Sequence, residues 1–230
     1  MSLPMADSGL PGLWPSDRHL SKTLNYGKSP ISPKPEKVKP IAYGWHMDTV
    51  NLLVLNAWAI IPLVLVGSLL HFAYDWSGHN KLVAVFAAVN ESYWEHIKIA
   101  FWPVLLWLVG LFAVGGWQIP GFIPAMTAAL YSVPVSMIAM VFGYKSITGK
   151  NLLWLDIAAF AITVGLALMI FALVATELAA SIWSIGISVL LLLPLGVAFT
   201  RYTYAPPNEP DLFVDPLNQR YGLDAHPEDN

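Results

Sequence analysis

The chain has 230 residues, of which 56% are hydrophobic and 12% are charged, and its formal net charge is −3 at pH 7. Soluble proteins carry about 25% charged residues, so this composition excludes an ordinary soluble domain and indicates an integral membrane protein. There is no cysteine and no basic cluster outside the N-terminal tail, which excludes disulfides and thiolate metal sites and argues against nucleic acid as a partner.

Residues 1–48 are predicted to form an extended, basic, proline-rich arm. The stretch KSPISPKPEKVKP, from Lys28 to Pro40, favours polyproline II and cannot bury enough apolar surface to fold alone. No short apolar stretch follows Met1, so we expect no secretory signal peptide. Such an arm is suited to binding along another surface.

Five long apolar runs lie between Val50 and Phe199 and predict an all-α fold, a bundle of five transmembrane helices over residues 49–202. A helix needs about 20 apolar residues to cross roughly 30 Å of hydrocarbon. Short links predict that sequential helices are antiparallel neighbours. The predicted spans are residues 50–74, 97–117, 121–143, 152–176 and 181–200.

Two local features modify this simple bundle. The link from Asp75 to Asn90 contains KLVAVFAAV, which is too short to cross the membrane and too apolar for water. It is therefore predicted to lie in the membrane interface or to fold back into it. Three prolines in or near the third span, Pro120, Pro124 and Pro134, predict a kinked or broken helix there.

The C-terminal tail, residues 203–230, is acidic, proline-rich and predicted to be extended. Because the number of spans is odd, the two tails are expected on opposite faces of the membrane. Lysine and arginine counts on the two faces nearly balance, and the basic arm before the first span favours a cytoplasmic N-terminus.

The same parity brings almost all ionisable side chains of the bundle to one leaflet. Such groups are costly in hydrocarbon unless they are paired, hydrated or functional, so the functional site is predicted at this end. The residues concerned are His71, Asp75, Glu91, Glu95, His96, Lys98, Tyr144, Lys145, Asp156 and Arg201.

The first interpretation of this end is a metal site. Carboxylate and imidazole together suit Zn or Fe, so His71, Glu91, Glu95 and His96 are candidate ligands of a divalent metal. A metal-bound water would make a hydrolase, for which Glu91, Glu95 and Asp156 are the candidate catalytic residues. His96 points roughly 100° away from Glu95 around the helix, so one ion held by both is geometrically awkward.

The second interpretation is a structural network. Glu91, Glu95 and Lys98 have the i, i+4, i+7 spacing of one helix face, and Glu95 can pair with Lys98. Asp156 can likewise be satisfied by Lys150 or Tyr144.

Two further roles follow from single residues. His71 alone is a candidate axial ligand to a tetrapyrrole of the haem or chlorophyll type. Asn90 stands where the N-cap of the second helix is expected.

Two stretches resemble the motifs of a known family. GSLLHFAYDWSGHN followed by VNESYWEHIKIAFWP resembles the signature HFxYxWSGxN and VNESxWEHxK of small, functionally uncharacterised bacterial multi-pass membrane proteins. The later GKNLLWLDIAAF resembles the start of that family's fourth span, so the resemblance covers roughly residues 65–170. It implies a bacterial inner membrane and no known activity.

The interpretation that we favour from the sequence is an accessory subunit of a larger membrane assembly, photosynthetic or respiratory. Its spans would pack against lipid and other membrane chains, and its tails would bind partners on both faces by wrapping around them. The alternative is an intramembrane metal-dependent hydrolase that uses His71, Glu91, Glu95, His96 and Asp156.

Overall fold

The computed structural model describes residues 48–208 and 211–226. The N-terminal arm predicted over residues 1–48 therefore lies, apart from Asp48, outside the described residues. Its extended conformation and its binding to partners stay predictions.

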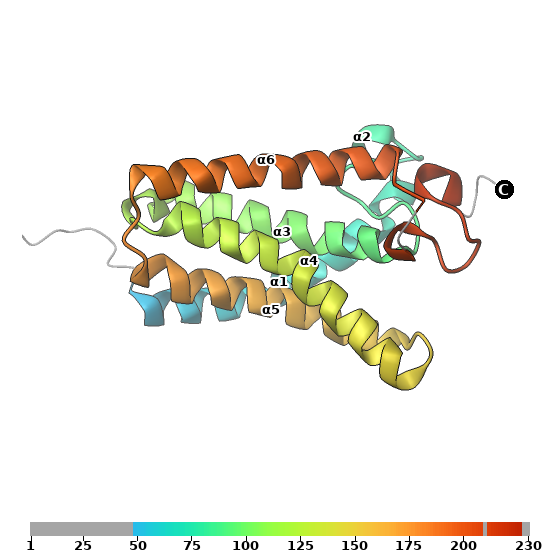
Figure 1. Ribbon diagram of the computed structural model, residues 1–230, viewed down its shortest axis with the longest axis horizontal. Coiled ribbons are helices and arrows are strands. Elements are labelled where there is room, and N and C mark those ends of the chain that lie inside the picture. Colours follow the sequence, from blue (N-terminus) through green and yellow to red (C-terminus); the bar gives the residue numbers. More distant parts are fainter. Residues whose placement is uncertain (1–47, 209–210, 227–230) are drawn as a thin grey trace, which may run out of the picture. The chain divides into compact units, whose positions relative to one another are not determined.

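Within the described ranges the chain is all-helical, as predicted, with one isolated β-bridge between Val214 and Tyr221 (Figure 1). The helices are α1 (Thr49–Trp76), α2 (Lys81–Ala84), α3 (Tyr93–Ala113), α4 (Phe122–Thr148), α5 (Leu153–Glu177) and α6 (Ile182–Tyr204), with short 3-10 helices η1 (Gly116–Gln118), η2 (Asp211–Phe213) and η3 (Gly222–Ala225).

Five of these helices, all except α2, are long and apolar enough to cross a membrane. They contain 21 to 28 residues. At 1.5 Å per residue the shortest is roughly 32 Å long, which matches a hydrocarbon core of about 30 Å. The prediction of five membrane-spanning helices is confirmed in the part of the chain that is described.

The helix ends carry capping groups that explain their positions. Asp48 accepts a hydrogen bond from the backbone N–H of Asn51 at the start of α1, and Ser181 and Ser184 form a capping box at the start of α6. Gly149 ends α4 with φ +71°, a left-handed conformation that glycine adopts without strain. These caps satisfy backbone groups that have no partner within the helix.

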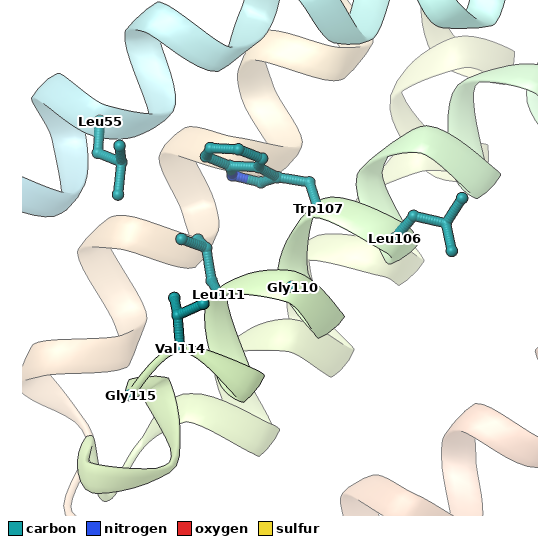
Figure 2. A pocket seen from close by; sticks show the side chains of 7 residues that line it. All are labelled: Leu55, Leu106, Trp107, Gly110, Leu111, Val114 and Gly115. Carbon is teal, nitrogen blue, oxygen red and sulfur yellow. The ribbon is translucent and has the colours of Figure 1, made fainter.

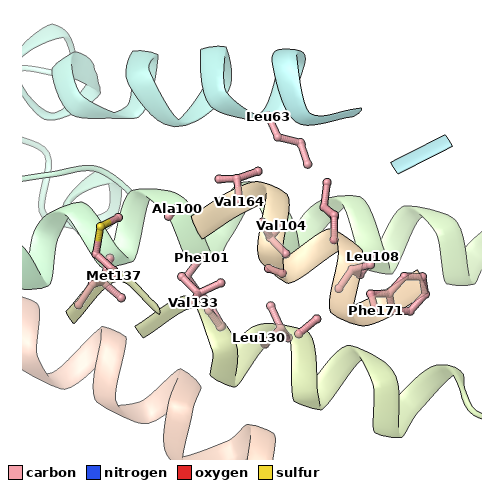
Figure 3. Packing of buried hydrophobic residues seen from close by; sticks show 14 of the residues in the cluster. Leu63, Ala100, Phe101, Val104, Leu108, Leu130, Val133, Met137, Val164 and Phe171 are labelled. Atoms are coloured by element: carbon pink, nitrogen blue, oxygen red, sulfur yellow. The ribbon is translucent and has the colours of Figure 1, made fainter. Parts of the chain in front are cut away.

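The core lies where α3, α4 and α5 meet, with α1 packed against α3 and α5 (Figure 3). Gly67 permits the close approach of α1, because a Cβ there would lie 2.8 Å from the carbonyl oxygen of Ile99. The labelled core side chains are all buried: Leu63, Ala100, Phe101, Val104, Leu108, Leu130, Val133, Met137, Val164 and Phe171.

The third span is not broken, although it contains two prolines. Pro124 lies in the first turn of α4, where the missing N–H would have no helical partner in any case, and Pro134 lies inside the helix. Figure 1 shows α4 as one continuous ribbon. A broken span, one of the two outcomes expected from the prolines, is therefore wrong.

The link between α1 and α3 folds back onto the bundle. Gly78 and His79 turn the chain with φ of +66° and +61°, and the N–H of Ala88 then donates to the carbonyl of Leu70 on α1. Ala84 is buried at the end of the short helix α2. The fold-back places residues 88–91 beside the last turns of α1.

The C-terminal segment contacts its own bundle, where the sequence predicted an extended tail that binds partners. Leu212 and Phe213 of η2 are buried, and the Phe213 ring lies 5.1 Å from the Trp94 ring and 5.3 Å from the Tyr202 ring. Figure 1 shows this segment at the end of the bundle where α1 ends and α3 begins. It therefore helps to enclose the polar end of the protein.

Candidate functional site

The candidate site lies at this polar end and is built from three segments. His71 is one helical turn before Asp75, so α1 presents both on one face in its last turns. Glu91 comes from the link before α3, and His96 from the first turn of α3. The fold-back of the link brings these residues together.

We call His71, Glu91 and His96 the first cluster. The Nε2 atom of His71 lies 3.3 Å from one carboxylate oxygen of Glu91, and Nε2 of His96 lies 3.9 Å from the other. The three potential ligand atoms all lie within 4.8 Å of one another. Ligands of a tetrahedral metal with bonds of about 2.0–2.1 Å are roughly 3.3 Å apart, so small side-chain movements suffice to close the cluster around an ion.

Hydrogen bonds orient the imidazoles of the first cluster. Nδ1 of His96 donates to the carbonyl of Ser92 at 2.9 Å, which leaves the Nε2 lone pair directed at Glu91 when the ring is neutral. A histidine ligand held in this way is typical of metal sites. Nδ1 of His71 is buried and has no hydrogen-bond partner among the described residues.

Glu91 is held by neighbouring side chains through both its carboxylate and its backbone. Its hydrogen bond with His71 lowers the pKa of the Glu91 carboxyl below the usual value, while partial burial acts in the opposite direction. The backbone N–H of Glu91 donates to the buried carboxylate of Asp215, at 3.1 Å. Asp215 thereby holds the residue that bridges both histidines.

A second cluster lies beside the first and contains Asp75, His79 and His226. Its potential ligand atoms also lie within 4.8 Å of one another. A cavity of about 140 Å³ adjoins both clusters, and it is lined by His71, Asp75, Ala88, Val89, Asn90, Glu91 and His226.

Glu95, a predicted ligand and catalytic candidate, is directed into the protein interior. Its side chain lies 2.5 Å from the Lys98 ammonium and accepts a hydrogen bond from the N–H of Val89. Lys98 also donates to the carbonyl of Ala84 and to the hydroxyl of Thr203. Both charges are almost completely buried, so the intrahelical pair is confirmed and Glu95 is not part of the first cluster.

Asp156, the other catalytic candidate, lies in the first turn of α5. Its carboxylate accepts a hydrogen bond of 2.5 Å from the Tyr144 hydroxyl, one of the two partners that the sequence suggested. It belongs to neither cluster.

Asn90 is not the N-cap of α3, so that prediction is wrong. The N-cap is Ser92, which makes no side-chain capping bond. The Asn90 side chain instead accepts from the N–H of Ser92 and donates to the carbonyl of Gly222. It joins the start of α3 to the C-terminal segment.

The surroundings of His71 favour a metal ion over a tetrapyrrole. The adjoining cavity of about 140 Å³ is smaller than the roughly 300 Å³ at which organic ligand pockets begin. A larger pocket, of about 530 Å³, lies between α1 and α3 near the opposite end and is apolar (Figure 2). Its only side chain with a polar atom is Trp107, which donates to Asn56, so this pocket suits hydrocarbon rather than metal chemistry.

Sequence reasoning missed three residues of this end: His79, Asp215 and His226. His79 stands at an unspecified position of the motif HFxYxWSGxN, so the motif did not single it out. Asp215 and His226 lie in the acidic tail, and no spacing in the sequence relates them to α1.

Comparison with known proteins identifies a family and no activity. A family model described as a family of unknown function (DUF6512) matches residues 47–223. No curated protein and no solved structure matches the chain. The matched range includes the whole first cluster and ends before His226.

Proposed function

The chain belongs to this family of unknown function, and we propose from its own geometry that it is a membrane-embedded hydrolase dependent on a divalent metal. The supporting observation is the convergence of His71, Glu91 and His96 with ligand atoms within 4.8 Å of one another. Two imidazoles and one carboxylate are a ligand set of catalytic zinc sites, in which a fourth position stays open for water.

The cavity beside the first cluster supplies space for that water. Its volume of about 140 Å³ would hold roughly four to five water molecules at about 30 Å³ each. His71, Glu91 and His96 would hold a zinc ion, which would supply an acidified water as a nucleophile near neutral pH. Glu95 and Asp156, which have other partners, are not required in this mechanism.

Metal binding is tested with the purified full chain in detergent. After chelation, the wild-type protein is loaded with Co²⁺, which stands in for Zn²⁺ and is visible by absorption. We expect Glu91→Gln and His96→Ala each to lose one bound equivalent. The control Glu177→Gln changes an exposed carboxylate at the far end of α5 and should lose none.

The open coordination position is tested on the same Co²⁺ protein. Azide should change its absorption spectrum, because the anion displaces bound water, and ester hydrolysis should depend on added Zn²⁺. Equal Co²⁺ binding by Glu91→Gln and Glu177→Gln would contradict the proposal. If the protein instead binds Fe²⁺ more tightly than Zn²⁺ and consumes O₂, the same ligand set would indicate an oxygenase.

One observation favours a second candidate, the accessory subunit of a larger membrane assembly. Only 22% and 17% of the residues in the hydrophobic segments of α1 and α6 are buried, whereas 44% to 50% of those in the other spans are buried. These two helices therefore offer the most apolar surface to lipid or to other membrane chains. Gentle detergent purification followed by mass spectrometry should recover defined partners, and recovery of the chain alone would count against this role.

We also propose a bacterial inner membrane with a cytoplasmic N-terminus, on the basis of the recognised motifs and the basic arm. The orientation is testable because the chain has no cysteine. A membrane-impermeant thiol reagent applied to intact cells should label Ser146→Cys near the end of α4 and should not label Ala179→Cys after α5. The reverse pattern would invert the topology.

A further inference from the structure

We infer that the polar end of the bundle binds a second divalent metal ion, through Asp75, His79 and His226. Nε2 of His226 lies 2.6 Å from one carboxylate oxygen of Asp75, and Nε2 of His79 lies 3.9 Å from the same oxygen. The two imidazole rings are 4.3 Å apart. Two imidazoles and a carboxylate again form a ligand set that zinc and other divalent transition metals bind.

The backbone at His79 holds its side chain in this place at a conformational cost. His79 has φ +61°, in the left-handed region that non-glycine residues rarely adopt, and it follows Gly78 with φ +66°. Its ring stacks on the Tyr74 ring at 5.1 Å and faces His226. Such conformations persist where the surrounding structure fixes them, and they are concentrated at functional sites.

The C-terminal segment that carries His226 is also held by contacts that do not involve Asp75. The carbonyl of Gly222 accepts from the Asn90 side chain at 2.8 Å, and the carbonyl of Ala225 accepts from Asn218 at 2.6 Å. The His226 residue is only 4% exposed. The fold of the C-terminal segment therefore supports the position of His226 in addition to its pair with Asp75.

The two clusters face one cavity. His71 and Asp75 are four residues apart on α1, which separates their Cα atoms by roughly 6 Å along the helix axis. Side chains of both clusters line the cavity of about 140 Å³. His71 and Glu91 would hold one ion and Asp75 and His226 the other at the walls of this shared cavity.

The experiment measures Zn²⁺ stoichiometry by equilibrium dialysis and elemental mass spectrometry on the full chain in detergent. We expect two equivalents in the wild type and one in Asp75→Asn, His226→Gln and His79→Gln. The matched control Asp224→Asn changes an exposed carboxylate of η3 and should keep two. Circular dichroism and gel filtration identify variants that do not fold, and His79→Gln leaves the pair between Asp75 and His226 intact.

The outcomes separate this inference from the proposed function. One equivalent in the wild type, lost in His96→Ala and kept in Asp75→Asn, would overturn the second ion and leave the first. One equivalent lost in Asp75→Asn and kept in His96→Ala would instead remove the first cluster as a metal site. Two equivalents in all three second-cluster variants would also overturn the inference.

Discussion

Replacing Lys98 by methionine should destabilise the protein strongly, because it leaves a buried carboxylate without its counter-ion. Lys98 is 0% exposed and Glu95 is 1% exposed, and Lys98 donates to Glu95, to Ala84 and to Thr203. After the substitution Glu95 still accepts a hydrogen bond from the N–H of Val89. Removing one member of a buried pair costs about 3–5 kcal/mol, so we expect a loss of this size.

The double variant Glu95→Gln with Lys98→Met should be less damaged than Lys98→Met alone. The glutamine is uncharged and can still accept from the N–H of Val89. The carbonyl of Ala84 loses its donor, and one unsatisfied buried acceptor costs about 1–3 kcal/mol. The expected loss for the double variant is therefore about 1–3 kcal/mol, well below the sum of the two single losses.

The assay is reversible unfolding in mixed micelles, followed by the fluorescence of the 10 tryptophans. Lys150→Met is the matched control, because Lys150 is exposed in the link between α4 and α5, and it should change stability by less than about 0.5 kcal/mol. A loss below about 1 kcal/mol for Lys98→Met, or a double variant as unstable as the sum of the singles, would refute the reasoning.

Three further predictions follow from local contacts. Gly67→Ala should lower the free energy of unfolding by about 1–3 kcal/mol, because the added Cβ would lie 2.5 Å from an aromatic carbon of α5. Its control Gly143→Ala, whose Cβ would meet nothing within 4 Å, should raise that free energy by up to about 1 kcal/mol in the same unfolding assay. Asp215→Ala removes the acceptor for the N–H of Glu91 and should weaken Zn²⁺ binding about 10- to 100-fold by dialysis, whereas exposed Asp211→Ala should leave affinity unchanged. Zn²⁺ at 100 times its dissociation constant should add about 2.7 kcal/mol of stability for each intact site, and no gain would contradict metal binding.

The spans and the gathering of these polar side chains at one end could be predicted from the sequence, because both depend on periodicity and length. Five apolar runs give five helices, and odd parity places His71, Glu91 and His96 at one end. The division of roles between Glu91 and Glu95 could not be predicted in this way. The i, i+4 spacing assumed one helix through both, but α3 begins at Tyr93, and Glu91 lies in the link.

The second cluster could not be predicted from the sequence, for a different reason. His226 meets Asp75 across 151 positions, through a tail whose composition predicted an extended segment. Its place depends on tertiary hydrogen bonds such as that from Asn90 to Gly222, and these leave no periodic pattern. Proline-rich composition limits regular helix and strand, yet it does not prevent a chain from packing against its own bundle.

The pairing of Glu95 with Lys98 on a single helix also bears on biogenesis. A helix that enters lipid with an unpaired ammonium group loses the hydration of that charge, which is costly unless a neighbouring helix supplies an acidic partner. Here α3 carries its counter-charge three positions away, so it can enter lipid as an electrically neutral unit. Insertion of this helix then need not wait for synthesis of the three spans that follow it.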